Sequence, residues 1–212
     1  MRVLVFGASI TQGFWDTEGG WVQRLRRHYD EIQIKKPGTF EQPTVFNLGV
    51  SGDSTRELLL RFGNEAKARQ WPNERYAFIF SVGTNNARAD RNGKTESSPE
   101  EYRADLEALV QKAKDYSDKV MFVGLPRCDE HLTTPVLWAD IYYRNDAIFR
   151  VEKIMREVAA KNNCPHVAVF ETFKKRMDSG ETLFADGLHP NSDGHELIYQ
   201  RVLPELDKLL AS

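Results

Sequence analysis

The sequence predicts an α/β protein built around a parallel sheet, and two patterns in its 212 residues support this. Short apolar runs rich in Val, Phe and Ile barely alternate with polar residues, which is typical of strands buried on both faces. Apolar residues at helical spacing fill the intervals, and strands that alternate with helices form parallel sheets with right-handed crossovers. We therefore predict one domain over residues 1–212. The runs expected as strands are 2–6, 44–48, 77–82, 119–124 and 166–170.

Five helices are expected, and an apolar stripe marks each of them. Ser54 and Glu57 have the spacing of a capping box at the start of the second helix, and Pro99 suits the first turn of the third. Pro204 should kink or divide the last one. The stripes are Trp21, Val22 and Leu25; Leu58, Leu59 and Phe62; Tyr102, Leu106, Leu109 and Val110; Ile141, Ile148, Val151, Ile154, Met155 and Val158; and Ile198, Val202, Leu206 and Leu209.

Charge and composition argue against several classes of protein. Lys and Arg number 29 against 31 Asp and Glu, so the formal net charge of −2 gives no strong field for nucleic acid or an anionic membrane. No apolar stretch approaches the ~20 residues of a membrane span. Cys128 and Cys164 lie far apart, without metal-ligand or redox spacing, and are expected to be free thiols in a reducing compartment. We expect a cytoplasmic protein without nucleic-acid partners or membrane insertion.

Polar residues follow three of the predicted strands, and a fourth polar segment precedes the last helix. Ser9 follows the first strand, Gly52 lies in a glycine-containing turn after the second, and Asn85 follows the third. Asp186 and His189 lie three residues apart in the fourth segment. Each segment alone has an ordinary explanation: a helix cap, a tight turn, a loop amide or the start of a helix. Parallel sheets, however, place their ligand sites at these carboxyl ends.

Together these residues contain every group that an acyl-transfer site needs. Ser9 Oγ would attack a carbonyl carbon, His189 would take its proton and return it to the leaving group, and Asp186 would hold the imidazole. The backbone N–H groups of Ser9 and Gly52, with the Asn85 side-chain amide, would stabilise the oxyanion. The chain order Ser, Asp, His is one of several that build this geometry.

The same segments resemble the GDSL-type lipases and esterases, the SGNH hydrolase superfamily. The resemblance is carried, in the family's order, by Gly7-Ala8-Ser9-Ile10, Asn47 to Gly52, Gly83-Thr84-Asn85-Asn86 and Asp186-Gly187-Leu188-His189-Pro190. It implies a flavodoxin-like three-layer α/β/α sandwich with a five-stranded parallel sheet, and neither a metal nor an organic cofactor.

The resemblance also assigns roles and exposes two departures. Ser9, Gly52, Asn85 and His189 match the four residues that give the superfamily its letters, and Asp186 matches the third member of the triad. The family usually has acids where this chain has Ala8 and Asn86. Neither position carries a catalytic role here, so the departures concern the hydrogen bonds that support the site.

The predicted function is a serine esterase that hydrolyses short-chain acyl esters of a small molecule, such as O-acetyl groups on a carbohydrate or another small polar carrier. Arg88 in the loop after the third strand, and Arg127 and Trp138 after the fourth, are the candidates for substrate binding. Trp15 and Tyr143 could line walls nearby, whereas His195 is expected to be a packing or surface residue of the next helix.

Other functions stay open on the sequence. They are a thioesterase or lysophospholipase-type acyl hydrolase of the same family, and a catalytically weak carbohydrate- or acyl-binding module on this fold. Binding of a phosphate or a flavin at the same sheet edge is disfavoured because the chain has no P-loop, and residues 11–13 lack the run of hydroxyls and glycines of a phosphate cradle.

Overall fold

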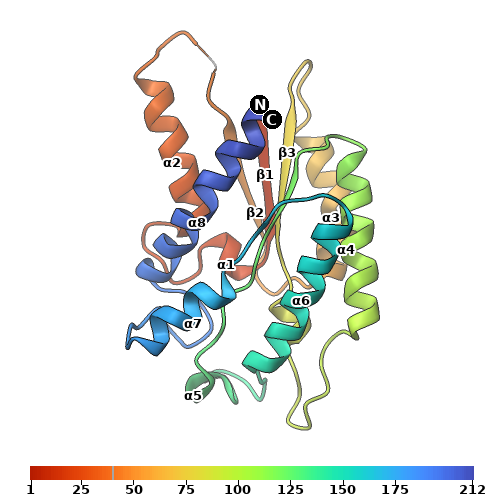
Figure 1. Cartoon of the computed structure of the whole chain (residues 1–212), viewed down its shortest axis with the longest axis vertical. Helices are drawn as coiled ribbons and strands as arrows, with labels where there is room; N and C mark the ends of the chain where they lie inside the picture. The colour runs from red at the N-terminus through yellow and green to blue at the C-terminus, as the bar shows by residue number, and fades with distance from the viewer. Residues whose placement is uncertain (40) are drawn as a thin grey trace.

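The computed structural model describes residues 1–39 and 41–212 and confirms the predicted parallel sheet. The sheet has five strands in the order β2-β1-β3-β4-β5, and every neighbouring pair is parallel. Helices cover both faces, which gives three layers when the sheet is seen edge-on (Figure 1). The strands are β1 (Arg2–Gly7), β2 (Thr44–Gly49), β3 (Tyr76–Ser81), β4 (Val120–Val123) and β5 (His166–Val167).

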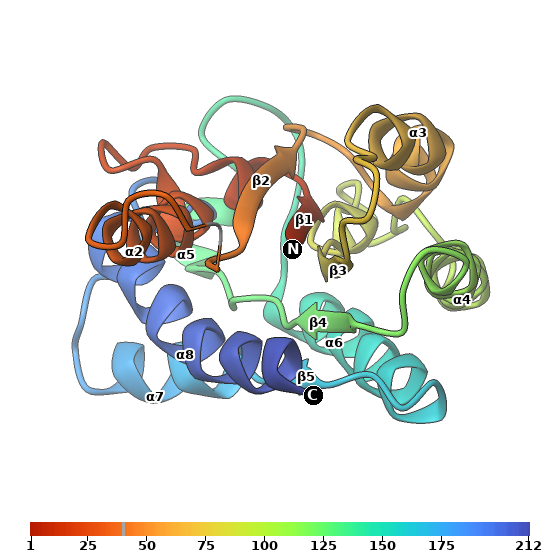
Figure 2. The same cartoon turned by 90° about the horizontal axis from the view of Figure 1, so that it is seen from above.

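The helices divide between the two faces. Figure 2 shows α2, α7 and α8 on one side of the sheet and α3, α4 and α6 on the other. The short helices α1 and α5 and the 3₁₀ turn η1 belong to the loops that follow β1, β4 and β3. The helices are α1 (Ser9–Gln12), α2 (Gly20–Ile34), α3 (Thr55–Ala68), η1 (Asn85–Ala87), α4 (Pro99–Lys114), α5 (Glu130–Thr133), α6 (Asn145–Lys161), α7 (Phe170–Asp178) and α8 (Ser192–Ala211).

Each face of the sheet has its own hydrophobic core. Val3 and Val5 of β1 pack in the cluster with residues of α2 and α8, whereas Leu4 and Phe6 pack in the cluster with residues of α3, α4 and α6. Because successive strand side chains point to opposite faces and both faces are covered, a central strand must be apolar at every position. This is why the apolar runs in the sequence barely alternate.

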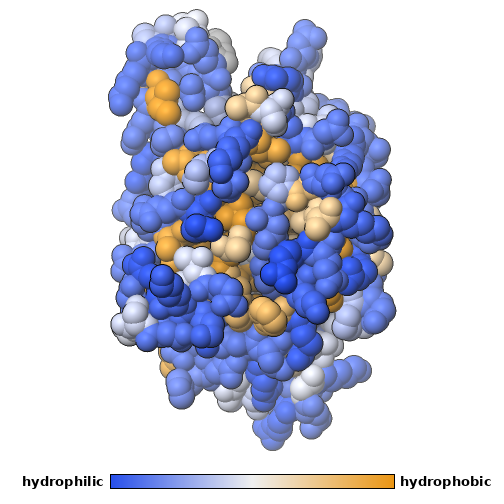
Figure 3. Space-filling model, viewed as in Figure 1, coloured by the Kyte–Doolittle hydropathy of each residue, from blue (hydrophilic) through white to orange (hydrophobic). Residues whose placement is uncertain are grey.

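The face of the molecule shown in Figure 3 is mainly hydrophilic. In the space-filling view, apolar side chains show mostly near the middle, between the two helical layers (Figure 3). No helix in the described part of the chain is both long and apolar enough to span a lipid bilayer.

The predicted helix starts are largely confirmed. Ser54 and Glu57 form the expected capping box of α3. Pro99 is the first residue of α4, and Ser98 and Glu101 cap this helix in the same way. Helix α8 continues through Pro204 as one element, so Pro204 does not divide it, and the alternative of a kink there stays a prediction.

The larger differences from the prediction lie in the second half of the chain. The fifth strand ends at Val167, and Phe170 begins α7, a helix that the apolar run concealed because Phe170 and Phe173 turn inward to the cores. Helix α6 begins at Asn145, so Ile141 lies in the preceding loop and packs on the core from there. A buried apolar side chain in a loop has the same sequence signature as one on a helix.

Candidate active site

The ends of three neighbouring strands bring the predicted site residues together. Gly7 pairs with Gly49 of β2 and with Ser81 of β3, so these strands end at the same level. Ser9, Gly52 and Asn85 follow these ends within a few residues. Because β1 lies between β2 and β3, the segment of Ser9 has the segments of Gly52 and Asn85 as its neighbours.

Ser9, His189 and Asp186 form a continuous chain of hydrogen bonds. His189 Nε2 lies 3.0 Å from Ser9 Oγ, and His189 Nδ1 lies 2.7 Å from Asp186 Oδ2. When Nδ1–H donates to the carboxylate, Nε2 is left free to accept from the serine hydroxyl. Ser9 and His189 are both buried, which limits the access of water to the bond between them. The arrangement can therefore remove a proton from a serine during attack on a carbonyl group.

The Asp186 carboxylate is fixed mainly by its own loop. Oδ1 accepts the backbone N–H groups of Leu188 at 2.9 Å and His189 at 2.7 Å. Burial by itself would raise the pKa of Asp186, but these bonds and the one from the His189 ring outweigh it, so the pKa lies below its usual value. Asp186 is therefore a charged partner for the imidazole near neutral pH.

Gly187 explains why this loop needs a glycine between Asp186 and Leu188. Its φ is +90°, in the left-handed region, and a Cβ there would lie 2.6 Å from the Cβ of Leu132 in α5. Any larger residue would push the loop away from α5 and displace the two backbone N–H groups that bind Asp186. The carboxylate and the imidazole thus take their relative position from a turn that only glycine fits.

Ser9, Gly52 and Asn85 line one pocket, and each residue carries an N–H donor. Ser9 is the first residue of α1, so its N–H has no partner within the helix. Gly52 has a φ of +88° and open space beside its Cα. Asn85 lies at the start of η1 with its side chain buried, and it lines the same pocket as Ser9 and Gly52. These groups could bind a negatively charged oxygen.

The Asn85 amide is oriented from both ends. Its Nδ2 donates to the Asp53 carbonyl at 2.9 Å, and its Oδ1 accepts from the Tyr143 hydroxyl at 3.0 Å. One amide hydrogen remains for a ligand. Burial raises the pKa of Tyr143 to about 12, so its hydroxyl keeps the proton that it donates. The Tyr143 bond was missed by sequence reasoning, because the two residues are 58 positions apart.

The two departures from the family pattern have different surroundings. Asn86 Oδ1 accepts from the Thr55 N–H at 3.1 Å, and its Nδ2 donates to Thr55 Oγ1 and Ser97 Oγ at 2.9 Å each. An acid at this position could accept the first bond but could not donate the other two when ionised. Ala8 precedes α1 and makes no side-chain cap. The Asn86 side chain therefore has a hydrogen-bond partner for its oxygen and for its nitrogen, whereas the segment at Ala8 is held by backbone hydrogen bonds alone.

An open pocket of about 340 Å³ lies over these groups. Trp15 and Trp138 are among its walls, and both are more than half exposed. The Trp138 ring lies 5.9 Å from the His189 ring, and the Phe14 ring lies 5.6 Å from it. The lining residues are Ser9, Phe14, Trp15, Ser51, Gly52, Asn85, Arg88, Trp138, Ile141, Tyr143, Asp186, Leu188 and His189.

The three candidates for substrate binding do not all reach this pocket. Arg88 and Trp138 line it. Arg127 does not line it: its Nη1 lies 3.5 Å from Asp178 Oδ1 at the end of α7. Helix α7 was not expected from the sequence, so no partner for Arg127 could be foreseen. Arg127 therefore lies outside the pocket that the other two candidates line.

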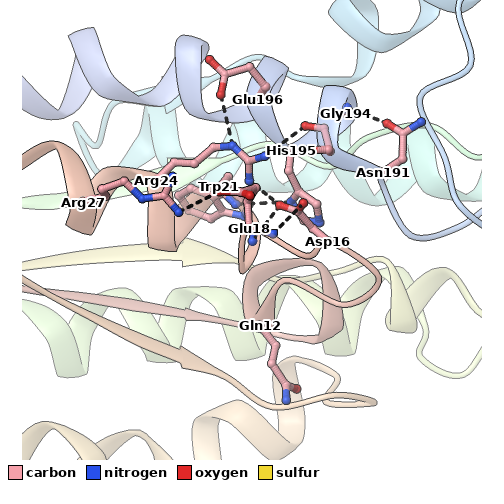
Figure 4. A network of polar contacts seen from close by, with 12 residues as sticks. Gln12, Asp16, Glu18, Trp21, Arg24, Arg27, Asn191, Gly194, His195 and Glu196 are labelled. Carbon is pink, nitrogen blue, oxygen red and sulfur yellow. Dashed lines mark hydrogen bonds and ion pairs between the residues drawn. The ribbon is translucent and has the colours of Figure 1, made fainter.

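A buried polar network joins the segment after Ser9 to the start of α8 (Figure 4). Asp16 forms an ion pair with Arg24 of α2 and also accepts the Gly20 N–H at 2.9 Å. Arg24 continues the network by donating to Ser192 Oγ at 2.8 Å and to Glu196 at 3.1 Å. The segment beside the serine is thereby tied to the helix that follows the His189 loop.

His195 completes this junction. It is fully buried in the first turn of α8, and its Nδ1 accepts the Trp21 N–H at 3.3 Å. Burial lowers the pKa of His195 to about 4, so it is neutral near pH 7. The packing role expected from the sequence agrees with this position. His195 is not among the residues that line the pocket of His189.

The fold and the site together define a carboxylic ester hydrolase. The model of the GDSL-like Lipase/Acylhydrolase family matches residues 5–197, and the chain belongs to this family. The match spans all four segments that carried the resemblance.

Similar proteins extend this result. The chain is 28% identical over 235 residues to the human protein named isoamyl acetate-hydrolyzing esterase 1 homolog, with 100% of this chain and 83% of the relative covered. It superimposes with a TM-score of 0.74 on a lipase/acylhydrolase from Enterococcus faecalis, at 22% identity over 97% of this chain and 94% of the other. It also superimposes with a TM-score of 0.74 on an acetyl xylan esterase from Geobacillus stearothermophilus. The two are 17% identical, and the match covers 96% of this chain and 93% of the other. Both structures support the fold.

Proposed function

We propose that this protein is a serine esterase that removes short acyl groups, acetyl above all, from esters of a small polar alcohol. Ser9 is the nucleophile, His189 the general base and acid, and Asp186 the residue that orients and stabilises the imidazole. The oxyanion is bound by the N–H groups of Ser9 and Gly52 and by the Asn85 amide. Arg88 and Trp138 contact the substrate.

The reaction follows from these positions. Ser9 Oγ attacks the carbonyl carbon while its proton passes to His189 Nε2, and the carbonyl oxygen becomes an oxyanion facing the three donors. His189 then protonates the departing alcohol oxygen, which leaves an acyl ester on Ser9. Water repeats the sequence, giving its proton to His189, and the carboxylic acid is released as Ser9 regains its hydrogen. No step requires a metal or an organic cofactor.

The observation that carries the proposal is that two cavities of very different volume meet at Ser9. The small one, of about 20 Å³, is bounded by Ser9, Asn85, Leu125 and Leu188 among others. This is room for about one water-sized group, such as the methyl group of an acetyl ester. The large one is the open pocket of about 340 Å³. A small acyl group and a larger alcohol fit this asymmetry.

The walls on the open side favour a polar alcohol. Arg88 and Ile141 also line a neighbouring groove of about 570 Å³, which continues along Asp90, Lys94, Glu96 and Asp140. Side chains of both charges provide donors and acceptors that suit a polyhydroxylated carrier better than an aliphatic chain. The names of the human relative and of the Geobacillus protein both refer to acetate esters. These points support the proposal independently of the cavity.

Acyl-chain length tests the proposal directly. With p-nitrophenyl esters, kcat/KM is expected to fall by roughly tenfold or more from acetate to butyrate, because each additional methylene lacks a cavity to enter. Acetylated sugars and acetyl thioesters, measured in parallel, identify the preferred carrier. Equal kcat/KM on acetate and octanoate would contradict the proposal and favour a lysophospholipase-type hydrolase. Absence of turnover together with absence of labelling by a fluorophosphonate would favour a binding module.

The pH dependence of kcat/KM is expected to show a single inflection between about pH 6 and pH 8, with activity rising toward high pH. The base must be neutral to accept the serine proton, and an ordinary imidazole loses its charge near pH ~6.5. The lowered pKa of Asp186 keeps that carboxylate charged throughout this range. The measurement is a profile of initial rates on p-nitrophenyl acetate, corrected for spontaneous hydrolysis. A flat profile across this window would contradict His189 as the base.

A further inference from the structure

We propose that Trp15 is a positioning residue for the reaction: its indole N–H holds the Asp186 oxygen that faces His189. The inference rests on the proposed function, since it assigns Trp15 a role in the triad. Trp15 Nε1 donates to Asp186 Oδ2 at 3.0 Å, and the same oxygen lies 2.7 Å from His189 Nδ1. The backbone N–H groups of the loop bind the other oxygen, Oδ1. Trp15 is thus the second donor on the oxygen that orients the imidazole.

The backbone at Trp15 shows that this contact is held at a conformational cost. Its φ is +61°, in the left-handed region. Among the described residues, only Asn73 and Asn163 share a positive φ without being glycine, and asparagine tolerates this region far better than tryptophan does. Trp15 is 63% exposed as a residue, so burial does not compensate for the strain. Strained residues of this kind concentrate at functional sites.

Both neighbours of Trp15 are anchored, which explains how the strain persists. The Phe14 N–H donates to the Ser9 carbonyl at 3.1 Å, and its ring packs beside His189. Asp16 is locked into the buried ion pair with Arg24. The single residue between these anchors has its side chain directed at the carboxylate. The serine segment therefore reaches the catalytic acid directly, as well as through the histidine.

Two donors on one carboxylate oxygen have predictable effects on the base. The second donor restrains rotation of the carboxylate and withdraws negative charge from the oxygen that faces the imidazole. Loss of the Trp15 N–H should therefore leave a stronger negative charge beside His189, which favours the protonated imidazole. Activity would then begin to rise at a higher pH.

The charged and titratable groups around the triad come from several elements. Burial raises the pKa of Tyr143 to about 12 and lowers the pKa of His195 to about 4, so neither changes charge between about pH 5 and pH 9. His131 is exposed, and its contribution to the pH profile can be eliminated by comparing all variants in a protein that also carries His131→Gln. Helix α5 packs on Gly187 of the triad loop and therefore also belongs to these surroundings. The charged and titratable groups around the triad are Arg88 and Tyr143 on the pocket side, His195, Asp16 and Arg24 on the α8 side, and Asp129, Glu130 and His131 at α5.

The experiment measures the rate at which a fluorophosphonate inactivates Trp15→Phe and wild type as a function of pH. Phenylalanine keeps an aromatic wall and the same backbone demand but cannot donate. We expect the inflection to move upward by roughly 0.3 to 1 pH unit and the plateau rate to fall by about three- to tenfold. Benzothienylalanine at position 15, which replaces only the N–H by sulfur, should reproduce the shift. The probe needs no assumption about the natural ester.

Two controls separate the possible outcomes. Trp138→Phe changes the other exposed tryptophan of the pocket and is expected to leave the inflection where it is, whatever it does to the plateau rate of inactivation. Trp15→Gly relieves the left-handed strain, so its melting temperature should not fall although its inflection shifts as in Trp15→Phe. An unshifted inflection in Trp15→Phe would overturn the inference and leave Trp15 as a pocket wall. A wild type that is not labelled at all would instead overturn the proposed function.

Discussion

Ser9→Ala is expected to abolish acyl-enzyme formation and to lower kcat by roughly 10⁵- to 10⁶-fold, the scale of loss seen when a triad nucleophile is removed. The reason is that no other described hydroxyl lies within hydrogen-bond reach of His189 Nε2. The side chain is small and its loss leaves a buried gap of one atom, so the fold should be retained. Intact-mass measurement after fluorophosphonate treatment shows the presence or absence of the adduct, and thermal unfolding monitors the fold.

Ser51→Ala provides the matched control for this prediction. Ser51 lines the same open pocket, but the hydroxyl that is hydrogen-bonded to His189 is that of Ser9, so this variant should still form the adduct. Labelling that survives in Ser9→Ala would show that another residue is the nucleophile. If Ser9→Ala loses both the labelling and the fold, Ser9→Cys is the variant to measure, because it preserves the volume of the side chain and a nucleophilic atom.

Arg24→Met is expected to destabilise the protein by about 3–5 kcal/mol, the usual loss when one partner of a buried ion pair is removed. The Asp16 side chain is fully buried and Arg24 is 9% exposed, so the carboxylate would remain in the interior without its cation. In a protein of this size such a loss lowers Tm by roughly 10 °C. Urea unfolding followed by circular dichroism measures it.

The pH dependence of this loss identifies its cause. Burial alone would raise the pKa of Asp16, but bonds from Arg24 and from two backbone N–H groups lower it to about 2. A lowered pKa contributes stability above the unfolded value of about 4, and that stability is lost as pH falls toward the folded value. The difference between Arg24→Met and wild type should therefore be larger at pH 7 than at pH 4.

The neighbouring Arg27 offers the contrast. It lies on the same helix and pairs with Glu18 at 3.0 Å, with about half of each side chain exposed. Arg27→Met is expected to change the free energy of unfolding by less than about 1 kcal/mol. Equal losses in Arg24→Met and Arg27→Met would mean that the buried network does not hold the segment beside the serine.

The sheet was predictable because its central strands are buried on both faces and therefore carry continuous apolar runs. Three site segments could be placed at one sheet edge because parallel strands end together, and the fourth was found because Asp186 and His189 are close in sequence. The sequence did not predict contacts between residues that are far apart along the chain. Nothing local marks the bond from Trp15 to Asp186, 171 positions away, or the turning of Arg127 toward an unforeseen helix. Helix α7 was not predicted because its first residue, Phe170, extends the apolar run of β5.

The ion pair at Asp16 also has a consequence for the order in which the molecule is assembled. Ser9 and His189 are 180 positions apart, and the partners that tie their segments together, Arg24 and Ser192, are 168 positions apart. Chains are synthesised from the N-terminus, and the early strands can pair before the later ones leave the ribosome. The nucleophile would then exist for most of synthesis without its base. A nascent chain should carry an inert serine, and reactivity toward fluorophosphonates should appear only after α8 has docked.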